Sequence, residues 1–139
     1  MFKLVTLFFA VAVAAHCVSA GEVTGELAKL GKVLHVACSS KFGVSEEEID
    51  KLKKAEFDDH SDKQMNYLTC LYDSSGAINA DDTLNTAVIE KLAPDAIKST
   101  APGVYKNCWE KQTETNKVQK RWNFQKCLYN AGSQYHIIL

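Results

Sequence analysis

Four widely spaced cysteines constrain the fold of this chain more than any other feature. They are Cys38, Cys70, Cys108 and Cys127; a fifth, Cys17, lies in an apolar segment at the N-terminus. An even number of cysteines in a small exported chain is typical of a disulfide framework. Zinc binding is the competing use, but no two of these cysteines are as close as the zinc-binding Cys-x-x-Cys motif requires. The sequence therefore predicts two disulfides and no metal site.

Residues 1–20 have the pattern of a signal peptide. The segment has a basic residue, Lys3, then an apolar run from Leu4 to Ala15, then small residues suited to cleavage before Gly21. The apolar run is short for a membrane span. We therefore expect Cys17 to be removed with this segment. The mature protein should be secreted and extracellular, without membrane insertion, and form a single domain over residues 21–139.

The charge of the chain is nearly balanced. It has 16 Lys and Arg against 17 Asp and Glu, a formal net charge of -1. Such a balance gives no electrostatic basis for binding nucleic acid or an anionic membrane surface.

Apolar residues recur at helical spacing along most of the mature chain, and no stretch alternates with the period of a strand. This pattern predicts an all-α fold of about six short helices. The expected helices cover residues 23–37, 45–57, 64–76, 81–93, 104–113 and 117–129. Ser45 and Glu48 indicate a capping box, Asp81 is expected to begin the fourth helix, and Pro102-Gly103 is expected to separate the fourth helix from the fifth.

The residues alone leave three disulfide pairings possible. The four cysteines fall on the first, third, fifth and sixth expected helices. A hairpin argument favours Cys108 with Cys127, because the residues between them form two helical pieces around a turn near Thr115-Asn116. That pairing leaves Cys38 with Cys70.

The leader segment, the six short helices and the cysteine spacing resemble the insect odorant-binding protein family, which has the pheromone and general-odorant-binding fold. This family usually has six cysteines, joined first to third, second to fifth and fourth to sixth. The four cysteines here match its first, third, fourth and sixth, so the resemblance implies the same pairing as the hairpin argument. Asn66 and Val118 stand where the second and fifth would be. Their joint substitution resembles the four-cysteine subgroup called minus-C.

The resemblance implies a carrier of small hydrophobic molecules, such as odorants, pheromones or fatty-acid-like ligands. It implies helices that enclose an apolar cavity of roughly 300 Å³ or more. The implied partners are the small ligand and a chemosensory receptor. The alternative is a secreted protein of saliva, venom or seminal fluid that acts through its surface. Wall residues are expected among the inward-facing apolar positions: Leu30, Leu34, Leu52, Met65, Leu68, Leu84, Val88, Val104, Trp109, Trp122 and Phe124.

No group of residues has the spacing of a catalytic or cofactor-binding motif, so we expect neither an enzyme nor a cofactor. The pair Asp59-His60 lies in a charged connector, which favours a solvated surface. His35 is expected to be a surface or partly packed residue. His136 is a candidate pH switch, because it lies in an apolar C-terminal stretch and histidine titrates near neutral pH. Residues 137–139 are expected to pack over the cavity or into a surface groove.

Overall fold

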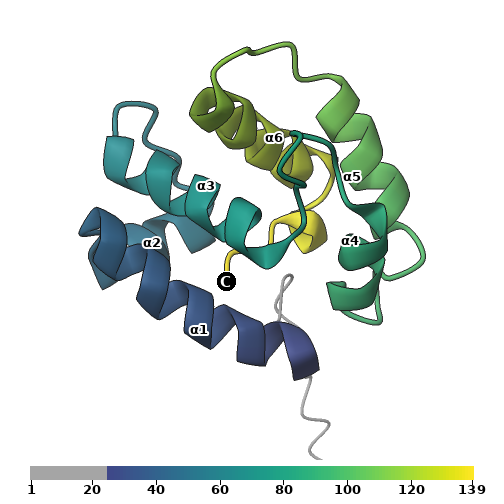
Figure 1. Ribbon diagram of the computed structural model, residues 1–139, viewed down its shortest axis with the longest axis horizontal. Helices are drawn as coiled ribbons and strands as arrows, with labels where there is room; N and C mark the ends of the chain where they lie inside the picture. The colour runs from purple at the N-terminus through teal and green to yellow at the C-terminus, as the bar shows by residue number, and fades with distance from the viewer. Residues whose placement is uncertain (1–24) are drawn as a thin grey trace, which may run out of the picture.

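A computed structural model describes residues 25–139, which form six α-helices and one short 3₁₀ helix (Figure 1). The elements are α1 (Gly25–Phe42), α2 (Glu46–Lys53), α3 (Asp62–Ser75), α4 (Thr86–Leu92), α5 (Ala101–Glu110), α6 (Lys117–Ala131) and η1 (Ser133–Tyr135). Within these residues the only β-pairing is an isolated bridge between Ile78 and Leu84. The predicted all-α fold is confirmed. The predicted signal peptide, residues 1–20, lies outside the described residues.

Three of the predicted helix boundaries coincide with caps that the structure contains, two made by side chains and one by a glycine backbone. Ser45 and Glu48 form the capping box: the Ser45 hydroxyl accepts from the Glu48 N–H at 3.2 Å, and the Glu48 carboxylate accepts from the Ser45 N–H at 2.9 Å. Gly76 ends α3 in the left-handed conformation, with φ of 78°. Asn116 begins α6 by accepting from the Gln119 N–H at 3.0 Å.

Several predicted boundaries are wrong. The first helix continues to Phe42 instead of ending at residue 37, and the second ends at Lys53 instead of residue 57. The fourth helix begins at Thr86 and not at Asp81, because Asp81 bonds to the nearby Thr83 N–H and forms a turn instead of a cap. Asn85 is the residue that caps α4, by accepting from the Val88 N–H. The fifth helix begins before Pro102 and not after it. Proline fits the first turn of a helix, since the N–H groups there have no partner within the helix.

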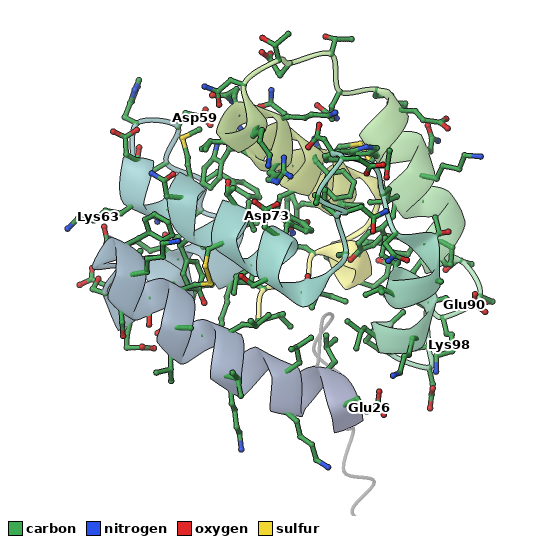
Figure 2. The ribbon with its side chains drawn as sticks, viewed as in Figure 1. Glu26, Asp59, Lys63, Asp73, Glu90 and Lys98 are labelled. Carbon is green, nitrogen blue, oxygen red and sulfur yellow. A yellow bond between two sulfur atoms is a disulfide. The ribbon has the colours of Figure 1, made fainter. Side chains whose placement is uncertain are left out.

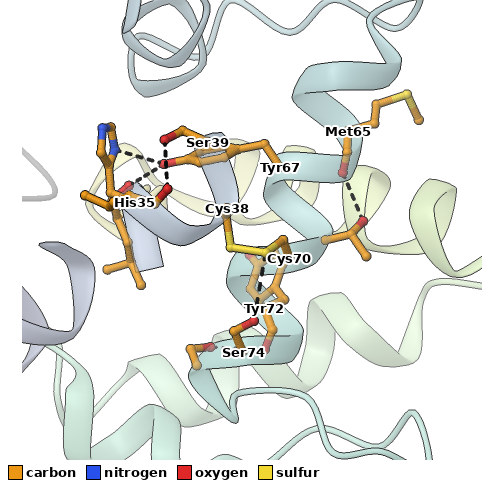
Figure 3. Close-up of a disulfide and its surroundings, with 12 residues drawn as sticks. His35, Cys38, Ser39, Met65, Tyr67, Cys70, Tyr72 and Ser74 are labelled. Carbon is orange, nitrogen blue, oxygen red and sulfur yellow. Dashed lines mark hydrogen bonds between the residues drawn. A yellow bond between two sulfur atoms is a disulfide. The ribbon is translucent and has the colours of Figure 1, made fainter. Parts of the chain in front are cut away.

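Two disulfides join the helices in pairs, with the pairing that the sequence predicts. Cys38–Cys70 joins α1 to α3 with its Cα atoms 5.8 Å apart (Figure 3), and Cys108–Cys127 joins α5 to α6 with its Cα atoms 5.7 Å apart. In the chain-entropy model each bridge stabilises the fold by about 3–4 kcal/mol.

The helices pack around α3 and α6. In Figure 1, α3 lies between α1 and α6, α5 packs against α6 and α4, and the C-terminal segment, residues 133–139, runs into the middle of the molecule. Aromatic rings fill the space between α3, α5 and α6. Phe124 is fully buried there, with the rings of Tyr72, Tyr105 and Trp109 at 5.1–5.7 Å from its own. The rings of Tyr105 and Trp109 meet Phe124 edge to face, and such contacts add to the burial energy of a core.

Candidate ligand pocket

A small apolar pocket lies among the helices, with a volume of about 70 Å³. Residues from α1, α3, the loop after α3, α4, α5 and the C-terminal segment form its wall. Figure 2 draws the side chains of these elements on the ribbon. The lining residues are Leu27, Leu68, Leu71, Tyr72, Ser75, Ala77, Ile89, Leu92, Ala93, Tyr105, Ile137 and Leu139. The volume is well below the expected size of roughly 300 Å³. That expectation is wrong for this conformation, because the aromatic rings fill the space between α3, α5 and α6.

Two helices and the C-terminal segment supply most of the wall. Leu68, Leu71, Tyr72 and Ser75 recur at three- and four-residue steps and so share one face of α3. Helix α4 and its C-cap contribute a second apolar stripe, made of Ile89, Leu92 and Ala93. Ile137 and Leu139 alternate with the buried Ile138, as in an extended segment with its two sides in different surroundings.

Hydrogen bonds hold the C-terminal segment in place. The Tyr105 hydroxyl donates to the Tyr135 carbonyl at 3.2 Å, and the Tyr135 hydroxyl donates to Thr100 Oγ1 at 2.9 Å. The Tyr67 hydroxyl donates to the Leu139 backbone oxygen at 2.9 Å. Leu139 also approaches α1 closely at Gly31, where an added Cβ would lie 3.5 Å from its side chain. These contacts place the segment in the pocket wall.

His136 belongs to a buried row of polar groups. Its Nε2 lies 2.8 Å from the Leu52 carbonyl oxygen, and its Nδ1 lies 2.8 Å from Gln125 Nε2. The other end of the Gln125 amide, Oε1, meets the Tyr72 hydroxyl, so the row ends at a residue of the pocket wall. Burial lowers the pKa of His136, and the hydrogen bond to Leu52 opposes that shift. The ring is therefore neutral at physiological pH.

The tyrosines around the pocket remain protonated. Burial raises the pKa of Tyr72 well above its ordinary value and also raises the pKa of Tyr105. Both phenols therefore keep their hydrogens at neutral pH, and each can donate one hydrogen bond.

Of the wall residues predicted from the sequence, Leu68 lines the pocket. Six others are buried in the core: Leu34, Leu52, Met65, Trp109, Trp122 and Phe124. The remaining four are partly buried and lie outside the pocket lining: Leu30, Leu84, Val88 and Val104. Helical spacing identifies an inward-facing side chain, but it does not tell a cavity wall from a packed core. Leu71 and Tyr72 share the face of Leu68, and this spacing was the available signal for them.

An open groove of about 210 Å³ shares Leu139 with the pocket, and its lining residues are Ala28, Gly31, Lys32, His35, Lys53, Ile138 and Leu139. His35 is partly packed there: its Nε2 lies 2.8 Å from Glu46, and its Nδ1 lies 3.2 Å from the Tyr67 hydroxyl (Figure 3). The expectation for this residue is confirmed.

In the acid–imidazole pair Asp59-His60, the Asp59 carboxylate has a structural role. Asp59 Oδ1 accepts from Trp122 Nε1 and from Lys126 Nζ, both at 2.6 Å, and so ties the connector before α3 to α6. Those bonds, led by the one from Lys126, lower the pKa of Asp59. Among residues 25–139, His, Cys, Asp and Glu form no group of three that could hold a metal ion.

These features define a class: an all-helical protein whose helices are joined by two disulfides around a small apolar pocket. The chain matches the model of the PBP/GOBP family over residues 20–131, and it belongs to that family. The family is one of small-ligand carriers and not of enzymes, and its members are typically secreted. No curated protein matches the sequence. In the part of the chain that the structure describes, no helix is long and apolar enough to cross a membrane.

Proposed function

We propose that this protein is an extracellular carrier that holds a small hydrophobic molecule in the pocket between α3, α4 and the C-terminal segment. One observation carries the proposal: the wall consists of aliphatic side chains, with two tyrosines and one serine as its polar side chains. Binding would remove the apolar surface of a ligand from water, a gain of about 25 cal/mol per Å². A chemosensory receptor remains a proposed partner.

The volume of the pocket limits which ligands enter it without a change of structure. Pockets for drug-sized ligands measure about 300–1,000 Å³, against about 70 Å³ here. Short volatile molecules are therefore the first candidates. Longer odorants, pheromones or fatty acids require Ile137 and Leu139 to move, which would join the pocket to the open groove that shares Leu139 with it.

We also assign the chain to the minus-C subgroup of the family. Support comes from the two disulfides, which correspond to the family's first-to-third and fourth-to-sixth bridges. Asn66 and Val118 take the places of the bridge that is missing, and both are partly buried.

Displacement of an apolar fluorescent probe tests the proposed function. The protein should bind the probe with micromolar affinity and release it to short alcohols and ketones. Ala93→Phe places a ring in the pocket wall and should abolish probe binding. Ala131→Phe, on the exposed end of α6, should leave it unchanged. Native mass spectrometry with solvent extraction would identify a ligand retained from the host.

The small cavity favours one alternative, a secreted protein that acts through its surface. A protein of that kind would be recovered empty, and no small molecule would displace a probe from it. Equal probe binding by Ala93→Phe and by the natural sequence would also support this alternative.

A further inference from the structure

The polar side chains of the pocket wall share one property: each hydroxyl hydrogen is already donated to another group of the protein. These side chains are Tyr72, Tyr105 and Ser75. Their acceptors are the Gln125 side-chain oxygen, the Tyr135 carbonyl and the Tyr72 carbonyl, respectively.

The Leu52 carbonyl fixes the direction of the hydrogen bonds that reach Tyr72. A carbonyl oxygen only accepts, so His136 Nε2 carries the hydrogen and donates to it. Because the ring is neutral, Nδ1 holds a lone pair and accepts from the amide nitrogen of Gln125. The amide oxygen of Gln125 therefore faces Tyr72, and the Tyr72 hydroxyl donates to it. The phenol oxygen keeps one lone pair and has no hydrogen left to give.

The hydroxyl groups of Tyr105 and Ser75 also act as hydrogen-bond donors to acceptors within the protein. The acceptor of Tyr105 is a backbone carbonyl, which cannot donate in return. Ser75 Oγ donates to the Tyr72 carbonyl at 3.1 Å and accepts from the Ala77 N–H at 3.3 Å. A ligand atom that reaches any of these three oxygens meets an acceptor.

We propose that the pocket selects ligands whose polar group donates a hydrogen bond, such as small aliphatic alcohols, over ketones of the same skeleton. The inference rests on the proposed function, since it names the ligand class of that pocket. An alcohol can donate to the free lone pair of Tyr72 or Tyr105. A ketone oxygen at the same place loses its hydrogen bonds to water and finds no side-chain donor among the lining residues.

Three ligands of equal length test this selectivity in the full-length secreted protein: 2-heptanol, 2-heptanone and heptane. Their dissociation constants are measured by probe displacement in the natural sequence, Tyr72→Phe, Tyr105→Phe and the double variant. Tyr129→Phe is the control, because Tyr129 is exposed and lies outside the pocket. Comparing the alcohol-to-ketone affinity ratio between variants cancels the different solubilities of the ligands.

Removing both phenol oxygens should lower the alcohol-to-ketone ratio about tenfold, or ~1.4 kcal/mol, and leave the affinity for heptane unchanged. Each single variant gives part of this loss, so the test survives if the double variant does not fold. The Tyr129→Phe protein should keep the natural ratio. An unchanged ratio in all foldable tyrosine variants would overturn the inference while leaving the carrier function intact. Failure of all three ligands to displace the probe would instead contradict the proposed function.

Discussion

The disulfide-linked helix pairs and the wall of the pocket are built differently. Cys38–Cys70 links α1 to α3, and Cys108–Cys127 links α5 to α6. Aromatic rings fill the space between α3, α5 and α6. The wall formed by α4 and the C-terminal segment has no disulfide. Helix α4 has seven residues, and Ile89 is its one buried side chain. Isolated helices of that length are marginal in water, so α4 depends on its packing.

The contacts that hold this wall are weaker than the disulfides and the aromatic core. The ion pair between Lys91 of α4 and Glu26 of α1 is largely exposed, and exposed pairs contribute little stability. The C-terminal segment is held by hydrogen bonds and aliphatic contacts. The cavity therefore lies where the fold can change volume without straining a disulfide or breaking the aromatic core.

The largest expected effect comes from truncating the aromatic core. Phe124→Ala should reduce the free energy of unfolding by about 3–5 kcal/mol, because the side chain is fully buried among three other rings. Urea unfolding with both disulfides intact measures it. Val36→Ala, at a 64% exposed position, is the control and should cost little. A loss below about 1 kcal/mol for Phe124→Ala would mean that the core relaxes as readily as the pocket.

Restoring the missing bridge should have the next largest effect. If the family correspondence holds, Asn66 and Val118 lie within disulfide reach, with Cα atoms about 4.4–6.8 Å apart. Asn66→Cys/Val118→Cys should then oxidise in a secretory host and raise stability by less than the usual 2–4 kcal/mol, since two bridges already restrict the unfolded chain. Thiol titration of the folded protein decides the point. Two thiols that stay reduced would refute the correspondence and with it the minus-C assignment.

Enlarging the pocket should change stability less than truncating the core. Ile137→Ala removes a half-buried side chain from the wall and should cost about 1–2 kcal/mol. The preferred ligand should become longer by one or more methylene groups, as measured by displacement with a series of 1-alkanols. The same series in Val33→Ala, an exposed position on α1, should keep its natural optimum. An optimum that stays fixed in Ile137→Ala would show that this residue does not limit ligand length.

The smallest effect concerns pH. Burial places the pKa of His136 below 6.5, so the unfolded chain takes up a proton before the folded chain does as the pH falls. Its contribution to stability is complete above about pH 6.5 and declines as the pH falls toward the folded-state pKa. The groups that contact its ring are Gln125, the Leu52 carbonyl, Phe57 and Tyr129, none of them acidic.

Replacing His136 should therefore flatten the pH dependence of stability. The free energy of unfolding is measured at pH 7.5 and 5.5 for the natural sequence and for His136→Gln. The difference between the two pH values should shrink in the variant. His60→Gln, at an exposed position, should keep the natural difference. An identical pH dependence in all three proteins would exclude His136 as a source of pH sensitivity.

The framework of the fold could be predicted from the sequence, because its signals are local. The capping box at Ser45 and the glycine after α3 each act within a few residues. The cysteines are read directly from the sequence, although their bridges join residues 32 and 19 positions apart. The start of α4 could not, since Asp81 can cap a helix or close a turn, and the bridge between Ile78 and Leu84 accompanies the turn. The sequence signals for a helix cap do not include such contacts between residues several positions apart.

The pocket was harder to predict than the framework for a related reason. The sequence pattern of a cavity-wall residue is the same as that of a core residue, as Trp109, Trp122 and Phe124 show. Whether such a side chain is packed in the core depends on the angles between the helices, which the sequence does not state. The polar row from Leu52 to Tyr72 joins residues of four different segments. No periodicity within one helix reveals such a row.

Methyl-resolved NMR can locate a bound ligand at the wall formed by α4 and the C-terminal segment. The protein, labelled at isoleucine, leucine and valine methyl groups, is titrated with 2-heptanol. We expect the resonances of Ile89, Leu92 and Ile137 to shift with one dissociation constant, while that of Ile49, buried outside the pocket, stays in place. Shifts confined to exposed Val33 and Val36, or no shifts at all, would show that no ligand binds in this pocket.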